Sequence, residues 1–150
     1  GAIAGDMIGS PYEAWPIKDK DFPLRVAAFT DDTVLTVAVA EAILKRGDYG
    51  RAIKRYARQY PDRGYGGTFR QWIWSGDDRP YGSFGNGSAM RVSPIGWAFD
   101  TVDEVLNEAE RAAAVTHDHP EGIKGAQAVA LGVLLARQGA SPAEAFMQLR

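Results

Sequence analysis

The sequence predicts an all-helical domain, and three observations support this prediction. The chain of 150 residues contains 23 Ala against 8 Leu, 8 Ile and 10 Val, whereas a sheet protein depends on branched and aromatic side chains. Ala is the best helix former, and its small side chain lets two helices approach closely. Capping boxes at Thr101 with Glu104 and at Ser141 with Glu144 mark helix starts. Residues 33–44 are apolar on nearly every side, which is typical of a buried helix.

The first half of the chain predicts three helices separated by one ordered loop. Small residues three to four apart near the N-terminus form a smooth stripe for helix packing. Prolines and mixed charges interrupt residues 12–28, which we therefore expect to form a loop. We expect helices over residues 1–10, 33–44 and 49–60, closed by Pro11, Gly47 and Pro61, respectively.

The second half predicts a loop-rich stretch followed by four helices. Seven glycines fall between residues 62 and 87, so we expect loops there around an apolar patch with Trp72 and Trp74. We expect one helix over residues 88–99, kinked at Pro94. The remaining helices are expected to begin at the Thr101 capping box, at Pro120 (ending before Gly139), and at the Ser141 capping box.

Composition excludes several classes of protein and site. Lys and Arg total 17 against 19 Asp and Glu, so the net charge of −2 gives no bias toward nucleic acid or anionic membranes. The absence of Cys excludes disulfides, thiolate zinc sites and a cysteine nucleophile. The longest nearly apolar stretch, residues 128–136, is too short to span a membrane. A cytoplasmic location is the default expectation.

Thr30, Asp31 and Asp32 form the sharpest local feature, at the start of the expected buried helix. One interpretation is helix capping, since Thr and Asp are favoured at helix starts and carboxylates complement the helix dipole. The other is a metal site, because adjacent carboxylates at a buried position repel each other unless a cation lies between them. Such hard oxygen ligands suit Mg²⁺, Ca²⁺ or Mn²⁺.

Residues 83–88, Ser-Phe-Gly-Asn-Gly-Ser, lead directly into an expected helix. Such a loop can turn several backbone N–H groups toward a phosphate, although the spacing matches no established phosphate-loop pattern. A tight turn with a capping Ser88 is the alternative.

The other polar and aromatic clusters have simpler interpretations. The pair His117 and His119 lacks a third soft ligand nearby, so we expect a polar helix entrance and no zinc site. The basic residues between 45 and 63 are expected to form a solvated helix face, with docking of an acidic partner as the alternative. Core positions are expected for Trp72, Trp74 and Trp97.

Five sequence blocks follow one another along the chain: Gly-x-x-x-Gly-Asp-x-x-Gly-x-Pro-Tyr-Glu at 1–13, Phe-Thr-Asp-Asp-Thr at 29–33, Arg-Gly-Tyr-Gly at 63–66, Ser-Phe-Gly-Asn-Gly-Ser-Ala-Met-Arg at 83–91 and Thr-His-x-His-Pro-Glu-Gly at 116–122. Together they resemble the ADP-ribosylglycohydrolase family, over residues 1 to about 136. The resemblance implies a compact orthogonal all-α domain with two Mg²⁺ ions, Mn²⁺ being an alternative. It also implies hydrolysis of the N- or O-glycosidic bond between ADP-ribose and a modified side chain or related conjugate.

The resemblance also implies roles for particular residues. The implied metal ligands are Glu13, Thr30, Asp31 and Asp32, of which Glu13, Asp31 and Asp32 are the implied catalytic residues. The implied ADP-ribose contacts are Gly64, Tyr65, Gly66, Ser83, Phe84, Gly85, Asn86, Gly87, Ser88 and His117.

The family completes its metal site with an Asp-x-Asp-Thr pattern near the C-terminus, and no such pattern follows residue 136 here. We therefore expect residues 1–150 to be the N-terminal part of a single domain that is truncated at its C-terminus. We expect self-association or a complementary C-terminal half, because truncation should expose the apolar side chains Leu131, Leu134, Leu135, Phe146 and Leu149. A catalytically inactive ADP-ribose-binding module and a structural remnant are the alternative functions.

Overall fold

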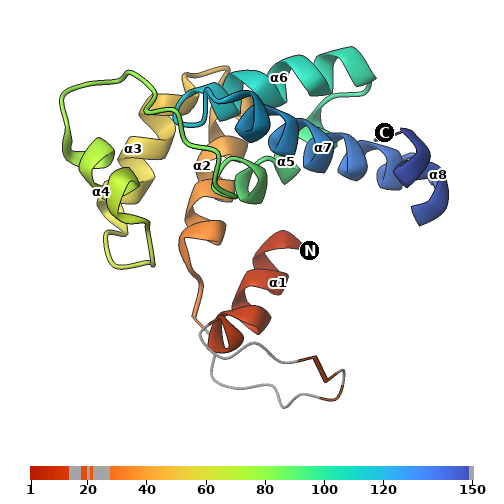
Figure 1. The fold of residues 1–150 in the computed structure, drawn as a ribbon, viewed down its shortest axis with the longest axis horizontal. Helices are drawn as coiled ribbons and strands as arrows, with labels where there is room; N and C mark the ends of the chain where they lie inside the picture. Colours follow the sequence, from red (N-terminus) through yellow and green to blue (C-terminus); the bar gives the residue numbers. More distant parts are fainter. Residues whose placement is uncertain (14–17, 20, 22–27, 149–150) are drawn as a thin grey trace.

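A computed structural model describes residues 1–13, 18, 19, 21 and 28–148, and every regular element in those ranges is a helix (Figure 1). The all-helical prediction is confirmed. The α-helices are α1 (Ala2–Gly9), α2 (Asp31–Leu44), α3 (Tyr49–Gln59), α4 (Gly67–Trp74), α5 (Ser93–Ala98), α6 (Val102–Ala114), α7 (Pro120–Arg137) and α8 (Pro142–Gln148). Two short 3₁₀ helices cover Ser10–Tyr12 and Ala89–Arg91.

Helix α2 lies at the centre of the arrangement and contacts α1, α3 and α5. Its side chains Val34, Leu35, Ala38 and Val39 are at most 3% exposed, as expected for a helix that is apolar on most sides. The N-terminus of α2 points toward α1, which projects from the rest of the molecule (Figure 1). The first turn of this buried helix therefore faces α1.

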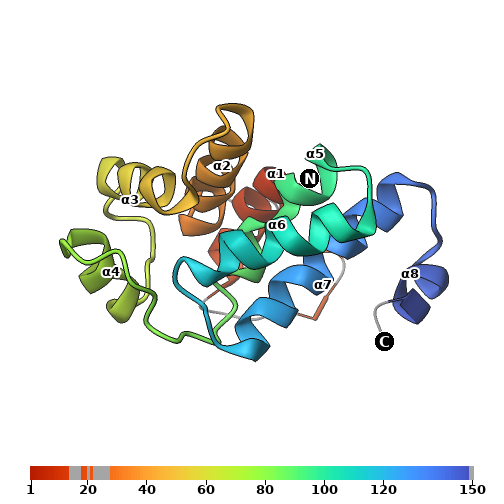
Figure 2. The same cartoon turned by 90° about the horizontal axis from the view of Figure 1, so that it is seen from above.

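Alanines carry the packing of α6 along α7, which lie side by side in Figures 1 and 2. Ala109, Ala112 and Ala113 on α6 and Ala126 and Ala130 on α7 are completely buried. The absence of larger side chains lets the helices approach closely, as the composition predicts.

Helix α5 also approaches α7 closely, at Gly96. A Cβ atom on Gly96 would lie 2.4 Å from the Ala130 carbonyl oxygen and 2.7 Å from the Val133 Cβ. We expect Gly96→Ala to lower the free energy of unfolding by about 1–3 kcal/mol, because the backbone must move to admit the methyl group. Urea unfolding provides the measurement. Gly125→Ala is the control: apart from the neighbouring backbone of α7 itself, no atom lies within 4 Å of the added Cβ, so a gain of about 0.5–1 kcal/mol is expected. Equal stabilities for the two variants would contradict this packing.

Helix α4 was not predicted from the sequence, which indicates a loop-rich stretch there. Phe69, Trp72 and Ile73 have helical spacing and are all buried. Gly66 and Gly67 at the start of α4 gave the segment the composition of a loop. Tertiary burial of one apolar face outweighs the low helix propensity of these glycines.

Residues 88–99 do not form one kinked helix. The 3₁₀ helix Ala89–Arg91 ends at Val92, and α5 begins separately with Pro94 in its first turn. A proline there costs no hydrogen bond, since the first helical N–H groups have no intrahelical partner. The two capping boxes are confirmed: Glu104 accepts from the Thr101 backbone N–H, and Glu144 accepts from that of Ser141.

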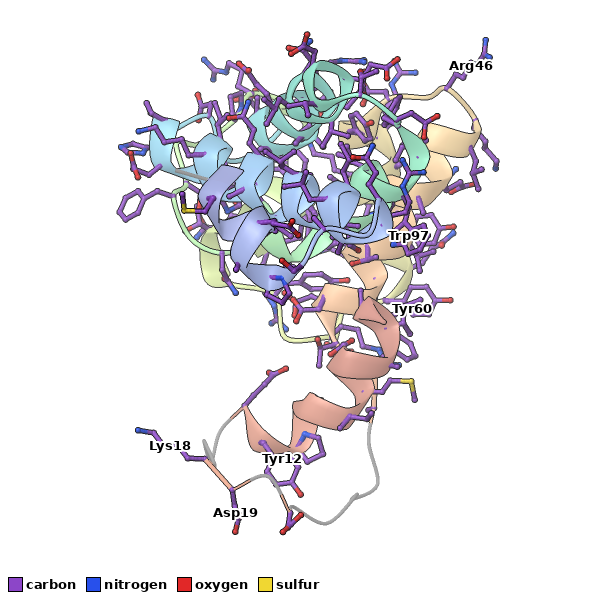
Figure 3. All side chains as sticks on the ribbon, turned by 90° about the vertical axis from the view of Figure 1, so that its right-hand side faces the viewer. Tyr12, Lys18, Asp19, Arg46, Tyr60 and Trp97 are labelled. Atoms are coloured by element: carbon purple, nitrogen blue, oxygen red, sulfur yellow. The ribbon has the colours of Figure 1, made fainter. Side chains whose placement is uncertain are left out.

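The exposed apolar surface differs from the sequence-based expectation. Trp72 is buried, but Trp74 and Trp97 are each 64% exposed, and Trp97 lies at the surface in Figure 3. The α7 side chains expected to be exposed are buried instead, because they pack inside the helical body: Leu131, Leu134 and Leu135. The side chain of Phe146, and Leu149, lie outside the described residues. The exposed large apolar side chains on α1 are Ile3, Met7 and Ile8.

Across the described ranges, no helix combines the length and the apolar character needed to cross a membrane.

Candidate functional site

An acidic cluster forms where α1 and the following 3₁₀ helix meet the start of α2. Asp6, Glu13 and Asp32 each offer a carboxylate oxygen, and these three oxygens lie within 4.8 Å of one another. An open pocket of about 390 Å³ adjoins the cluster and is lined by Glu13, Thr30, Arg63 and Gly64, among others. This spacing of carboxylate oxygens can hold a divalent cation.

Asp6 connects α1 to the N-terminus of α2. Its Oδ2 accepts from the backbone N–H groups of Thr30 and Thr33, at 2.8 and 3.2 Å, and from the Thr33 hydroxyl. Its Oδ1 accepts from the Thr30 hydroxyl at 2.7 Å. Burial alone would raise the pKa of Asp6, but hydrogen bonds from Thr33 and Thr30 outweigh it and lower the pKa. Asp6 therefore stays ionised and caps α2 from a neighbouring helix.

Asp6 lies in the first family-like block, but no role for it is predicted from the sequence. The sequence does carry one indication of such a role: Asp6 is the only charged residue in a helix otherwise made of apolar residues and glycine. Such a residue must find polar partners when it is buried.

Thr30 is the N-cap of α2 and has its hydroxyl oriented by two neighbours. The hydroxyl donates to Asp6, and its oxygen accepts from the Asp32 backbone N–H at 3.3 Å. A hydroxyl oxygen has two lone pairs, so one remains available to a cation. The capping and metal-binding interpretations of this segment are therefore compatible.

Asp31 lies beside the turn at residues 64–66. Its backbone N–H donates to the Arg63 carbonyl at 2.8 Å, and its Oδ1 lies 3.3 Å from where a Cβ on Gly64 would be. Burial, followed by repulsion from Asp32, Glu13 and Asp6, raises the pKa of Asp31 to about 6. Burial, followed by repulsion from Asp6 and Glu13, raises the pKa of Asp32. The cluster thus carries a charge repulsion that a cation would relieve.

This repulsion predicts that Asp31→Asn stabilises the metal-free chain above pH 6. The folded pKa near 6 exceeds the unfolded value near 3.9, so the penalty is present above pH 6 and disappears as the pH falls toward 4. After allowance for partial exposure and a weakened helix-dipole interaction, the gain in unfolding free energy is about 1 kcal/mol at pH 7.

Chemical unfolding of parent and Asp31→Asn in chelator, at pH 7.5 and pH 4.5, checks this expectation. The difference between the two proteins isolates Asp31 from other titrating groups. A variant that is less stable than the parent at pH 7.5 would show that Asp31 acts mainly as a structural helix-start residue.

The turn at residues 64–66 contributes backbone, not an open aromatic surface. Gly64 has a φ of +98°, which favours glycine, and Gly66 is the N-cap of α4. Tyr65 is buried against Phe69, with ring centroids 5.4 Å apart, and burial and the charge of Asp31 raise its pKa. The Tyr65 hydroxyl is enclosed and has no hydrogen-bond partner among the described residues.

The loop at residues 83–88 lies against the segment that contains His117. The Ser83 N–H donates to the Thr116 carbonyl at 3.3 Å, and the Ser88 hydroxyl donates to the Gly122 carbonyl at 2.8 Å. The Asn86 carbonyl accepts from Met90 N–H, which starts the helical turn after the loop.

Phe84 and the two glycines of this loop have different environments. Phe84 is 72% exposed, and its ring centroid lies 5.2 Å from that of His119. A Cβ on Gly87 would lie 3.1 Å from His117 Cε1, whereas a Cβ on Gly85 would meet only Ser83 Oγ at 3.7 Å. Neither of these glycines has a positive φ. Close packing therefore distinguishes Gly87.

The acidic cluster and the 83–88 loop are both attached to α2. The Thr36 hydroxyl, four residues after Asp32, donates to the Met90 carbonyl at 3.3 Å. Four helical residues rise about 6 Å, so the cluster lies about one helical turn along α2 from the anchor of the loop. One helix thus holds both groups of predicted site residues.

Comparison with known proteins identifies the family. The ADP-ribosylglycohydrolase sequence profile matches residues 1–150. The chain is 31% identical to the "ADP-ribosylhydrolase ARH3" proteins of Bos taurus and Homo sapiens, over 99% of the chain and 51% of each relative. It is 27% identical to "Uncharacterized protein YegU" of Escherichia coli K12, over 94% of the chain and 53% of the relative. The chain spans about half the length of these curated relatives. On this evidence, it belongs to the ADP-ribosylglycohydrolase family.

Proposed function

We propose that this chain is the N-terminal part of a Mg²⁺-dependent hydrolase that releases ADP-ribose by cleaving an N- or O-glycosidic bond. The observation that carries the proposal is the acidic cluster, where Asp6, Glu13 and Asp32 converge beside Asp31 and an open pocket. The family match and the names of the relatives support this reaction class.

The donor set of the cluster fits a hard divalent cation. Carboxylate and hydroxyl oxygens suit Mg²⁺, and Mn²⁺ accepts the same ligands. Glu13, Thr30, Asp31 and Asp32 would hold the metal, while Asp6 orients the Thr30 hydroxyl. Two octahedral ions need about twelve coordination positions, so further ligands must come from water, substrate or protein outside residues 1–150.

The bound metal would supply positive charge that orients substrate oxygens and stabilises charge as the glycosidic bond breaks. Departure of the leaving group creates an oxocarbenium-like sugar, which a neighbouring carboxylate stabilises or which water attacks with carboxylate assistance. Asp31 and Asp32 are the proposed carboxylates for this role because they lie in the first turn of α2, directly after Thr30, which lines the pocket. Glu13, which also lines the pocket, can position substrate.

The 83–88 loop and the 64–66 turn are the proposed ADP-ribose contacts. Backbone N–H groups near Gly85, Asn86 and Gly87 can bind phosphate oxygens, and exposed Phe84 can contact a base or ribose. Burial, and secondarily the charge of Arg91, lowers the pKa of His117 to about 4, so this side chain is neutral at physiological pH.

Gly87→Val tests the loop. The branched side chain would collide with the His117 ring, because even a Cβ lies 3.1 Å from Cε1, and the loop would have to move. We expect at least a 10-fold weaker affinity for ADP-ribose by calorimetry. Gly85→Ala, whose Cβ has ordinary contacts, should remain within about 3-fold of the parent. Equal affinity of the Val variant and the parent would show that this loop does not hold the ligand.

The reaction itself is tested by incubating the chain, extended by a C-terminal half, with Arg-linked and Ser-linked ADP-ribosylated peptides, with Mg²⁺ or with chelator. Release of free ADP-ribose only with Mg²⁺ is the expected result, and the preferred linkage identifies the acceptor class. Binding without release by both this chain and a form carrying a C-terminal half would favour the alternative, an inactive binding module. Absence of both binding and release would favour a structural remnant.

A cytoplasmic location, the absence of nucleic-acid and membrane partners, and self-association remain predictions. The sequence indicates self-association through an exposed face of α7, but the leucines of that face are buried. The exposed apolar side chains of α1 offer a different surface for self-association.

A further inference from the structure

Arg91 is a completely buried cation next to the proposed ligand loop. It ends the 3₁₀ helix that follows residue 88, and its Nη2 donates to the Ala112 carbonyl at 2.8 Å and the Thr116 hydroxyl oxygen at 2.9 Å. Its Nε and Nη1 have no hydrogen-bond partner within the described ranges, and no carboxylate there forms an ion pair with it. Burial lowers its pKa only to about 10, so the guanidinium remains charged.

Thr116 connects this cation to His117. Its hydroxyl oxygen lies 2.7 Å from His117 Nδ1, and both residues are buried. A guanidinium can only donate, so the Thr116 oxygen must accept from Arg91. The single hydroxyl proton is then free to point toward Nδ1.

The hydrogen bond with Thr116 determines which ring nitrogen of His117 carries the proton. If Nδ1 accepts from Thr116, the proton of the neutral imidazole lies on Nε2. Nε2 lies 3.2 Å from where a Cβ on Gly87 would be, and has no hydrogen-bond partner among the described residues. The ring therefore presents an N–H donor at the 83–88 loop.

We propose that Thr116, oriented by Arg91, is a positioning residue that fixes neutral His117 as the Nε2–H tautomer, so that His117 donates to an oxygen of the ligand held at the 83–88 loop. The presence of a ligand at this loop and its identity as ADP-ribose rest on the proposed function, whereas the tautomer of His117 does not.

The surroundings of His117 favour this arrangement over the opposite tautomer. With the proton on Nδ1, the Thr116 oxygen would accept from both Arg91 and His117, and its own proton would lack an identified acceptor. The positive charge of Arg91 also opposes full protonation of the ring, although Asp118 acts in the other direction. The Tyr81 ring also faces His117, with ring centroids 6.2 Å apart.

The tautomer can be measured by long-range ¹H–¹⁵N correlation spectra of protein labelled at histidine. The chain has two histidines, and His119→Asn assigns their signals while supplying an amide oxygen in place of His119 Nδ1 as the acceptor for the Glu121 N–H at the start of α7. We expect His117 to show a protonated Nε2 and an unprotonated Nδ1 at pH 7. A protonated Nδ1 in the parent protein would overturn the proposal.

Thr116→Ser and Thr116→Val form the matched pair. Ser keeps the hydroxyl and should keep the Nε2–H tautomer, whereas Val keeps the branched shape and should give a mixture of tautomers. Folding of each variant is checked by its backbone spectrum. Arg91→Met should also give a mixture, and if this buried substitution prevents folding, the Thr116 pair decides the question. An unmixed Nε2–H tautomer in folded Thr116→Val would overturn the proposal.

Calorimetry with ADP-ribose measures the consequence for binding. We expect Thr116→Ser to stay within about 2-fold of the parent and Thr116→Val to lose about 10-fold or more in affinity. Unchanged affinity in the Val variant would overturn the positioning role. A parent protein that shows the Nε2–H tautomer and the Thr116 dependence but binds no ADP-ribose would contradict the proposed function and leave the proton arrangement supported.

Discussion

Replacing Asp31 and Asp32 together by Asn is expected to abolish Mg²⁺-dependent ADP-ribose release in a form of the protein that carries a complete metal site. Neutral amides cannot offset the charge of two divalent ions, and the substitution removes both carboxylates from the first turn of α2. We expect release to fall by at least about 1,000-fold, the scale of losing directed electrostatic stabilisation of a transition state. Initial rates at saturating Mg²⁺ provide the measurement.

Asp103→Asn is the matched control for this double substitution. Asp103 is an exposed carboxylate in the first turn of α6, so the same chemical change occurs at an equivalent helix position. This variant should retain the parent rate. Unchanged turnover in the Asp31→Asn/Asp32→Asn protein would exclude both residues from the metal site and from catalysis.

The 150-residue chain by itself is expected to bind Mg²⁺ weakly and to show no hydrolysis. The described cluster offers only a few oxygen ligands, and Asp6 already accepts four hydrogen bonds from Thr30 and Thr33. Linking the C-terminal half of an ARH3 relative after Arg150 should strengthen Mg²⁺ binding and produce measurable release, because it would supply the remaining ligands.

Sedimentation of the 150-residue chain and of the extended protein measures self-association. It therefore separates two effects of the added half: supplying metal ligands and covering exposed apolar surface. The chain alone should self-associate through α1, because Ile3, Met7 and Ile8 are 39–44% exposed on a projecting helix (Figure 3). Ile3→Gln with Met7→Gln should reduce this association without restoring hydrolysis. A stable monomer with full Mg²⁺-dependent turnover in the 150-residue chain would contradict this prediction.

The sequence predicted the features that depend on local physics. Caps and prolines gave the starts of α6 and α7, and the crowding of Asp31 and Asp32 at one helix start follows from their adjacency. Helix α4 was missed because its glycine-rich start resembles a loop, while burial of Trp72 is a property of the whole fold.

The site residues that were not predicted from the sequence depend on contacts between segments that are distant along the chain. Asp6 reaches Thr30 across 24 positions, and the Arg91 contact with Thr116 spans 25. Periodicity cannot indicate such partners, because it describes one element at a time. The same limit explains why Trp74 was expected in the core: its apolar character was visible, but the side of α4 that faces solvent was not.

Electron paramagnetic resonance with Mn²⁺ tests most directly whether the acidic cluster holds a divalent cation. Free Mn²⁺ is counted while metal is titrated into the parent, Asp32→Asn and Asp103→Asn proteins, each in the chain extended by a C-terminal half. We expect saturable binding that Mg²⁺ displaces in the parent and Asp103→Asn, and at least a 10-fold weaker affinity in Asp32→Asn. Equal binding by all three proteins would contradict the assignment of the metal site to the start of α2.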